Sequence, residues 1–191
     1  MDTIPFELKI RRSGKDVGTE TVLCRRSLRV IADNREVFDA QWKDREVIVK
    51  VFSRGLVSRI RFKREWGGLV EHERRGISAP KILFYGETAD VKRALVLEKI
   101  GGSQTMEEIF SKASTEKRIE LLIMVCREMA GQHEKGILQK DTHLGNFLWD
   151  GNQIFSIDPA QTRFLSRPAE KKESIAQLVL LTSNIQGEEE K

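Results

Sequence analysis

The sequence predicts an α+β fold in which a small antiparallel sheet comes first and a mostly helical region follows. Between residues 28 and 52, short runs of alternating apolar and polar residues are separated by turn signals, as in a β-meander. Over residues 57–75 and 115–136, apolar residues instead recur every three or four positions, which is typical of helices. At 191 residues, with 39% hydrophobic and 32% charged residues, the chain can bury a real core as one domain or a small two-lobed one.

The sheet is predicted to contain five strands. They are Leu28–Ile31, Val37–Trp42, Val47–Phe52, Lys81–Gly86 and Ala94–Ile100. Turns are expected at Ala32–Asn34 and Lys43–Arg45. Residues 1–27 mix polar and basic residues with turn signals at Ser13–Lys15 and Val17–Gly18, so we expect a loosely attached arm or short edge strands there.

One lysine and one glutamate are predicted to form an ion pair. In the strand VIVKVF, Lys50 lies between Ile48 and Phe52 on its own face, so its ammonium group needs an anion or a path to water. In the helix over residues 57–75, Phe62, Glu65, Trp66 and Leu69 are spaced i, i+3, i+4 and i+7, which puts Glu65 on the core-facing stripe. The alternative is that both residues lie at solvated surfaces.

The later helices carry apolar stripes. Thr115 is the expected N-cap of a long helix ending before Gly136. Its predicted stripe is Ile119, Leu122, Ile123, Cys126, Met129, Ala130 and His133, which makes His133 a core histidine rather than a catalytic one. A last helix is expected to open at Ser166 and Pro168, with Ile175, Leu178, Val179 and Thr182 on one face.

The stretch from His133 to Asp158 concentrates three candidate polar residues. Asp150-Gly151-Asn152 separates two short apolar runs, which predicts a β-hairpin. Asn146 and Asp158 then meet at the open end of that hairpin, because neighbouring strands lie ~4.8 Å apart. Asp141 lies on the loop that enters this end. Two acids and an amide suit a Mg²⁺ ion whose shell is completed by phosphates; the alternative is that the acids are turn residues and Asn146 is a cap.

The composition argues against several classes of protein. No apolar run has the length of a signal sequence or a membrane span, so we expect neither export nor insertion. Cys24 and Cys126 are far apart, which argues against a zinc site and fits a reduced cytoplasm. Residues 1–80 carry 18 Lys and Arg against 12 Asp and Glu, yet aromatic residues are not interleaved with them, so we expect no nucleic-acid partner.

The ordered set Lys50, Glu65, Asp141, Asn146 and Asp158 resembles the protein-kinase-like enzymes. The stretches FKREWGGLVEHERRGISAP, H-x-x-G-I from His133 and IDPAQTRFLSR are most similar to the bacterial lipopolysaccharide kinases, which phosphorylate Kdo or heptose sugars.

This resemblance implies a two-lobed kinase-like fold: an arm (1–27), an N-lobe (28–100) and a reduced, mostly helical C-lobe (101–191). It implies ATP and Mg²⁺ as cofactors and a sugar or glycolipid acceptor at the cytoplasmic face of the inner membrane.

The resemblance also assigns roles to individual residues. Asp141 would act on the acceptor hydroxyl, while Asn146 and Asp158 would bind Mg²⁺. Lys50, positioned by Glu65, would hold the ATP phosphates. Glu98 and Ile100 would offer backbone groups to the adenine.

The sequence departs from the kinase pattern at several points. The turn over residues 32–36 has no glycine, Gln139 and Lys140 replace the usual His-Arg, Pro159 follows the metal-type Asp158, and there is no A-P-E segment. Two alternatives therefore stay open: a minimal protein kinase similar to the RIO type, and a pseudokinase that binds nucleotide without transferring phosphate.

Overall fold

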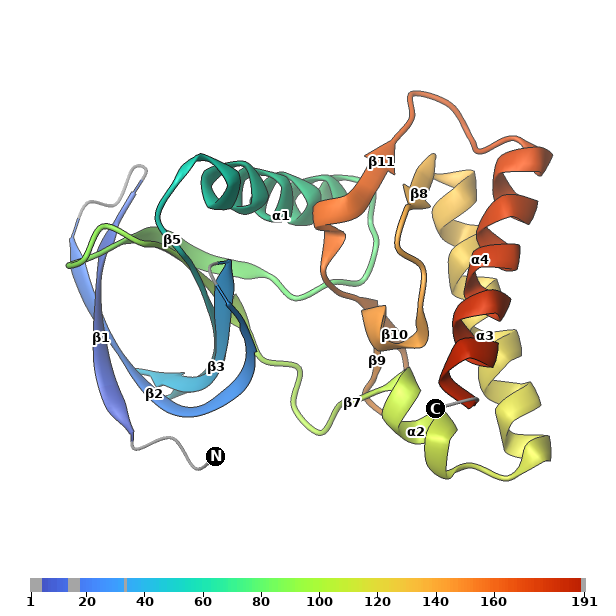
Figure 1. Cartoon of the computed structure of the whole chain (residues 1–191), viewed down its shortest axis with the longest axis horizontal. Helices are drawn as coiled ribbons and strands as arrows, with labels where there is room; N and C mark the ends of the chain where they lie inside the picture. Colours follow the sequence, from blue (N-terminus) through green and yellow to red (C-terminus); the bar gives the residue numbers. More distant parts are fainter. Residues whose placement is uncertain (1–4, 14–17, 33, 190–191) are drawn as a thin grey trace. The chain divides into compact units, whose positions relative to one another are not determined.

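The computed structural model describes residues 5–13, 18–32 and 34–189. The chain divides into two compact units (Figure 1), each described by itself below. The first is Met1–Gly67 with Pro80–Lys99, and the second is Gly68–Ala79 with Ile100–Lys191. The helix α1 (Leu56–Arg74) contributes residues to both.

A closed six-stranded barrel forms the first unit, in the order β1-β2-β3-β4-β6-β5. Its strands are β1 (Phe6–Arg12), β2 (Thr19–Ile31), β3 (Arg35–Trp42), β4 (Arg45–Phe52), β5 (Ile82–Thr88) and β6 (Arg93–Glu98). Every neighbouring pair is antiparallel. Val47, Val49 and Val51 point into the barrel core, as the alternation of the strand predicted.

The N-terminal segment differs from the loose arm or short edge strands that the sequence suggested. β1 pairs with β2 from Phe6↔Cys24 to Arg11↔Thr19, and its end also pairs with β5. Ile10, Val22 and Cys24 of these strands are fully buried in the barrel core. A Cβ atom on Gly86 would lie 2.0 Å from the carbonyl oxygen of Arg11, so a glycine is required where the barrel closes. Ser13 is described, but the turn residues 14–17 and Asp33 lie outside the described part of the chain.

The helix α1 forms where the sequence predicted it; it ends at Arg74, and Gly76, whose φ is 64°, follows. Its buried stripe is unusually polar: Ser58, Phe62, Glu65, Leu69 and His72. Trp66, expected on this stripe, is instead 36% exposed at its edge. The physical reason is that the buried face of α1 is narrow. It contains Phe62, Glu65 and Leu69, at i, i+3 and i+7, and Trp66, at i+4, lies beside it.

The histidine on this stripe is neutral in the folded protein. His72 is fully buried and packs edge-on against the ring of Phe164. Neither ring nitrogen has a hydrogen-bond partner in the described part of the chain. Burial, and then the charge of Arg75, lower the pKa of His72 to about 4.

The second unit is mostly helical and carries short strand pairs. Its helices are α2 (Met106–Lys112), α3 (Thr115–Glu134) and α4 (Lys171–Glu189), with 3₁₀ turns η1 (Leu144–Asn146) and η2 (Pro159–Gln161). Its strands are β7 (Gln104–Thr105), β8 (Ile137–Gln139), β9 (Phe147–Trp149), β10 (Ile154–Ser156) and β11 (Thr162–Phe164). β10, β9 and β7 form one small sheet, and β11 pairs with β8.

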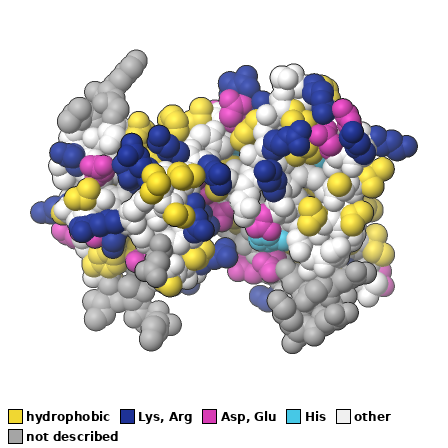
Figure 2. Space-filling view, turned by 45° about the horizontal axis from the view of Figure 1, so that its top comes forward, with side chains coloured by type: hydrophobic (Ala, Val, Ile, Leu, Met, Phe, Trp, Pro, Cys, Tyr) yellow, Lys and Arg dark blue, Asp and Glu magenta, His cyan; other side chains and the backbone are white. Residues whose placement is uncertain are grey.

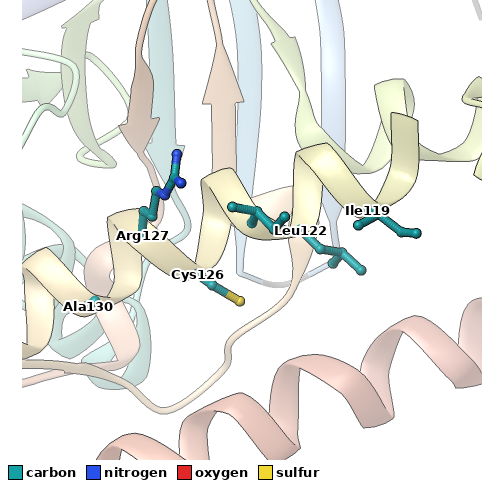
Figure 3. Close-up of a pocket in the computed structure, with 6 residues that line it drawn as sticks. Ile119, Leu122, Cys126, Arg127 and Ala130 are labelled. Atoms are coloured by element: carbon teal, nitrogen blue, oxygen red, sulfur yellow. The ribbon is translucent and has the colours of Figure 1, made fainter. Parts of the chain in front are cut away.

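The apolar residues of α3 divide between the core and the surface. Met129 is buried in the core of this unit, as predicted, but Leu121 and Val125, which are also buried there, lie one position before Leu122 and Cys126 of the predicted stripe. The predicted stripe residues Ile119, Leu122, Ile123, Cys126 and Ala130 instead line a surface groove of about 390 Å³, together with Arg127 (Figure 3). The N-cap is Ser114 rather than Thr115.

The helix α4 also turns its predicted apolar face outward. Ile175, Leu178 and Val179 are exposed, whereas Gln177 and Leu181 are buried. Gln177 is buried because it hydrogen-bonds to Nε2 of His133, 2.9 Å away. His133 is therefore a core histidine, as the sequence predicted.

Candidate active site

In the first unit, the ion pair predicted between Lys50 and Glu65 is present. Lys50 Nζ lies 2.6 Å from Glu65 Oε1, and the Glu65 side chain is fully buried. The pair forms because Lys50 lies on the outer face of β4, where the neighbouring Phe52 packs edge-on against Phe62 of α1. A carboxylate that is held out of water and hydrogen-bonded to an ammonium fixes the position of both groups.

A second cation, which the sequence analysis missed, binds the same carboxylate. Arg35 Nη1 lies 3.0 Å from Glu65 Oε2, and only 12% of the Arg35 side chain is exposed. Arg35 opens β3, opposite Phe52 in the register with β4, so it lies diagonally next to Lys50 on one face of the sheet. An arginine that begins a strand gives no local signal of such a contact, because the partner is thirty residues away.

In the second unit, the predicted hairpin is formed by β9 and β10. Its register runs from Ile154↔Trp149 to Ser156↔Phe147, around a turn in which Asp150 accepts hydrogen bonds from the N–H groups of Asn152 and Gln153. These bonds lower the pKa of the Asp150 carboxyl group. Asp150 is thus a turn residue and not a site residue.

At the open end of the hairpin, hydrogen bonds join Asn146 to Asp141 and to Ile157, the residue before Asp158. The N–H of Ile157, next to Asp158, donates to the carbonyl oxygen of Asn146 at 2.9 Å. The side chain of Asn146 donates from Nδ2 to the carbonyl oxygen of Asp141 at 2.6 Å. The exposed Asp141 side chain accepts a long hydrogen bond from Gln161, Oδ2 to Nε2 at 3.4 Å. Asp158 has left-handed backbone angles, φ 55° and ψ 52°.

These side chains fit a magnesium ion that is bound together with phosphates. Because the amide nitrogen of Asn146 is used by Asp141, the amide oxygen is the atom left for a cation. One amide oxygen and one carboxylate are hard ligands but too few to complete the shell of Mg²⁺. Within residues 5–13, 18–32 and 34–189, no three His, Cys, Asp or Glu side chains form a metal-binding group, so phosphate oxygens and water would have to supply the remaining ligands.

The loop before Asp141 is held by a buried network of amide side chains. Gln139 Nε2 donates to Gln132 Oε1 at 2.9 Å and to Ser156 Oγ at 3.1 Å. Its carbonyl oxygen accepts from Thr142 Oγ1 and from Gln177 Nε2. The network ties the loop to α3, α4 and the hairpin, so Gln139 has a structural explanation at a position where the sequence departs from the kinase pattern.

The residues predicted at the adenine edge are near the end of β6. The N–H of Glu98 donates to the carbonyl oxygen of Lys81 at 2.9 Å. The carbonyl oxygen of Ile100 accepts from Ser103 Oγ at 2.7 Å. The N–H group of Glu98 and the carbonyl oxygen of Ile100 are therefore already used within the chain.

Comparison with known proteins identifies the family and supports the fold. A model of the lipopolysaccharide kinase (Kdo/WaaP) family matches residues 25–179. The chain belongs to this family. Among solved structures, it is similar to vaccinia related kinase 3, with a TM-score of 0.52 and 11% sequence identity over 75% of this chain and 48% of the other. This match supports the predicted kinase-like fold, although the chain spans only about half the length of that kinase. A search of curated proteins gave no match.

Two surface arginines of this lipopolysaccharide kinase family member form ion pairs with the same glutamate. Arg163 and Arg167, which could have met an anionic acceptor, bind Glu173 at 3.2 and 2.9 Å. The pKa of Glu173 is lowered to about 2, first by Arg167. On the face that Figure 2 draws, Lys and Arg side chains lie among acidic and hydrophobic ones. Among the described residues, no helix has the length and apolar character needed to cross a bilayer.

Proposed function

We propose that the chain is an ATP- and Mg²⁺-dependent kinase that phosphorylates a sugar hydroxyl group of the lipopolysaccharide core, on Kdo or heptose. The observation that supports the proposal is that Asn146, at the open end of the hairpin, is hydrogen-bonded both to Asp141 and to Ile157, the residue before Asp158. Membership of the lipopolysaccharide kinase family supports both the reaction and the sugar acceptor.

Each residue has a role that its surroundings support. Asp141 is exposed and so can receive the acceptor; it orients the hydroxyl group and accepts its proton. Asn146 and Asp158 hold Mg²⁺, which when bound neutralises charge on the transferred phosphoryl group. Positioning and charge stabilisation then supply most of the rate.

The nucleotide would be held by Lys50 and by backbone groups at and after the end of β6. Lys50, fixed by Glu65, contacts the phosphates, while the Glu98 carbonyl and Ile100 N–H groups bind the adenine edge. Because the turn at residues 32–36 has no glycine, backbone N–H groups contribute less to phosphate binding than in glycine-rich loops, and Lys50 carries a larger share.

The acceptor places the protein at the inner membrane. A lipid-linked sugar presents its hydroxyl group at the cytoplasmic face, so we propose a cytoplasmic protein that binds this face peripherally. Nucleic acid plays no part in the proposed reaction.

The test is Mg²⁺-dependent ATP turnover by the purified protein with a Kdo- and heptose-containing glycolipid. Asp141→Asn should lower kcat at least ~100-fold and leave ATP binding unchanged. Asp44→Asn, the same change in the exposed turn before β4, is the matched control and should behave as wild type.

Three results would contradict the proposal. Phosphate incorporation into added protein rather than glycolipid would favour the minimal protein kinase. ATP binding without turnover under any condition would favour the pseudokinase. Loss of ATP binding in a folded Asp141→Asn variant would remove the role given to Asp141.

A further inference from the structure

The two adjacent glycines in the middle of α1 have different surroundings. A Cβ atom on Gly67 would meet nothing within 4 Å. A Cβ atom on Gly68 would lie 2.7 Å from Cβ, 2.8 Å from Cγ and 2.8 Å from the carbonyl oxygen of Pro159. Glycine is unfavourable inside a helix, and only Gly68 is explained by a close contact.

The residue that Gly68 contacts follows the proposed metal ligand directly. Pro159 is buried and begins η2, where its carbonyl oxygen accepts the N–H of Thr162. The preceding Asp158 has a positive φ, which is uncommon for a residue with a side chain. A residue before proline is also disfavoured in helical conformations. Such a backbone persists only when its surroundings hold it.

Contacts hold Asp158 from both sides in the chain. On the N-terminal side, Ile157 donates to Asn146, and Ser156 donates from its N–H to the carbonyl oxygen of Ser78 at 2.8 Å. On the C-terminal side, the packing of Pro159 on Gly68 fixes the next residue.

We propose that Gly68 is a positioning residue for Asp158: the missing side chain lets Pro159 pack directly on α1 and so sets the place of the metal-binding carboxylate. The inference rests on the proposed function. A methyl group at position 68 would have to push Pro159 away by ~0.7 Å to restore ordinary contact at 3.4 Å. Metal–ligand distances tolerate only about 0.2 Å, so this shift is large enough to weaken Mg²⁺ binding.

The experiment compares Gly68→Ala with its matched control Gly67→Ala. The readout is the binding of a fluorescent ATP analogue, titrated with Mg²⁺ and repeated in EDTA, with circular dichroism to check folding. We expect Gly67→Ala to stay within about twofold of wild type. Gly68→Ala should need at least ~10-fold more Mg²⁺ for half-maximal binding, while binding in EDTA stays unchanged.

A double variant tests the contact itself. Pro159→Gly in the Gly68→Ala background removes two of the three close atoms, so it should recover part of the Mg²⁺ affinity compared with Gly68→Ala alone. If Gly68→Ala folds poorly, the double variant still tests the contact, because the alanine then meets fewer close atoms.

The outcomes separate this inference from the function on which it rests. An unchanged Mg²⁺ requirement in folded Gly68→Ala, or equal losses in Gly67→Ala, would overturn the role of Gly68 alone. A wild-type protein whose nucleotide binding does not respond to Mg²⁺ would overturn the proposed function, and this inference with it.

Discussion

Removing the charge of Glu65 should lower the free energy of unfolding much more than removing the charge of its partner Lys50. Glu65 binds both Lys50 and Arg35 and is fully buried. Glu65→Gln keeps the shape but takes the carboxylate from two cations at once. Removing one member of a buried ion pair costs about 3–5 kcal/mol. We expect Glu65→Gln to lower the free energy of unfolding by that amount.

Lys50→Met is the informative counterpart. The methionine fills similar space, and Glu65 keeps its 3.0 Å contact with Arg35. The charged hydrogen bond to Glu65 is lost and an apolar side chain is gained, so we expect a cost of about 1–2 kcal/mol. Lys50→Met should therefore stay folded while its ATP binding weakens.

Urea unfolding followed by circular dichroism and tryptophan fluorescence measures both values. The comparison that matters is between the loss in free energy of unfolding for Glu65→Gln and the loss for Lys50→Met. Equal costs for Glu65→Gln and Lys50→Met, or a cost below about 1 kcal/mol for Glu65→Gln, would show that Arg35 does not share the carboxylate.

Three further predictions concern the second unit. The pKa of His72 is about 4 in the folded protein and near 6.5 when unfolded. Between these two pH values only the unfolded chain binds a proton on His72. The free energy of unfolding should therefore be highest above pH 6.5 and about 2 kcal/mol lower at pH 5. Urea titrations in which His72→Leu keeps the same dependence on pH would refute this. Asp158→Ala should abolish the Mg²⁺ dependence of nucleotide binding, and an unchanged dependence by fluorescence titration would overturn its assignment. Gly136→Ala should cost at least about 2 kcal/mol by thermal unfolding, because its φ is 69° and its Cβ would lie 2.4 Å from the carbonyl oxygen of Arg167; Gly131→Ala, with open space around it, is the control and should not destabilise.

The features predicted correctly from the sequence are those with local signals. The hairpin around Gly151 follows from turn residues between two apolar runs. Lys50 and Glu65 could be paired because each breaks an apolar pattern at a position that the strand or helix period makes buried. These signals lie within a few residues of the feature they predict.

The features that the sequence analysis missed depend on contacts between distant segments. Arg35 reaches Glu65 only after the barrel and α1 have packed. The first two strands were underestimated because their exposed positions mix polar residues with apolar ones such as Leu23, so no clean alternation marks buried positions such as Ile10 and Val22. The helices α3 and α4 carry apolar residues on more than one face, so periodicity alone could not choose which face is buried. Gly68 gave no signal either, since its partner Pro159 lies ninety-one residues further along.

The most direct test of the central claim is mass spectrometry of the acceptor after incubation with ATP and Mg²⁺. The account predicts that wild-type protein adds phosphate to a Kdo or heptose residue of the glycolipid and that Asp141→Asn adds none. A glycolipid that stays unmodified in the presence of protein shown to bind ATP, or one modified equally by Asp141→Asn, would contradict it.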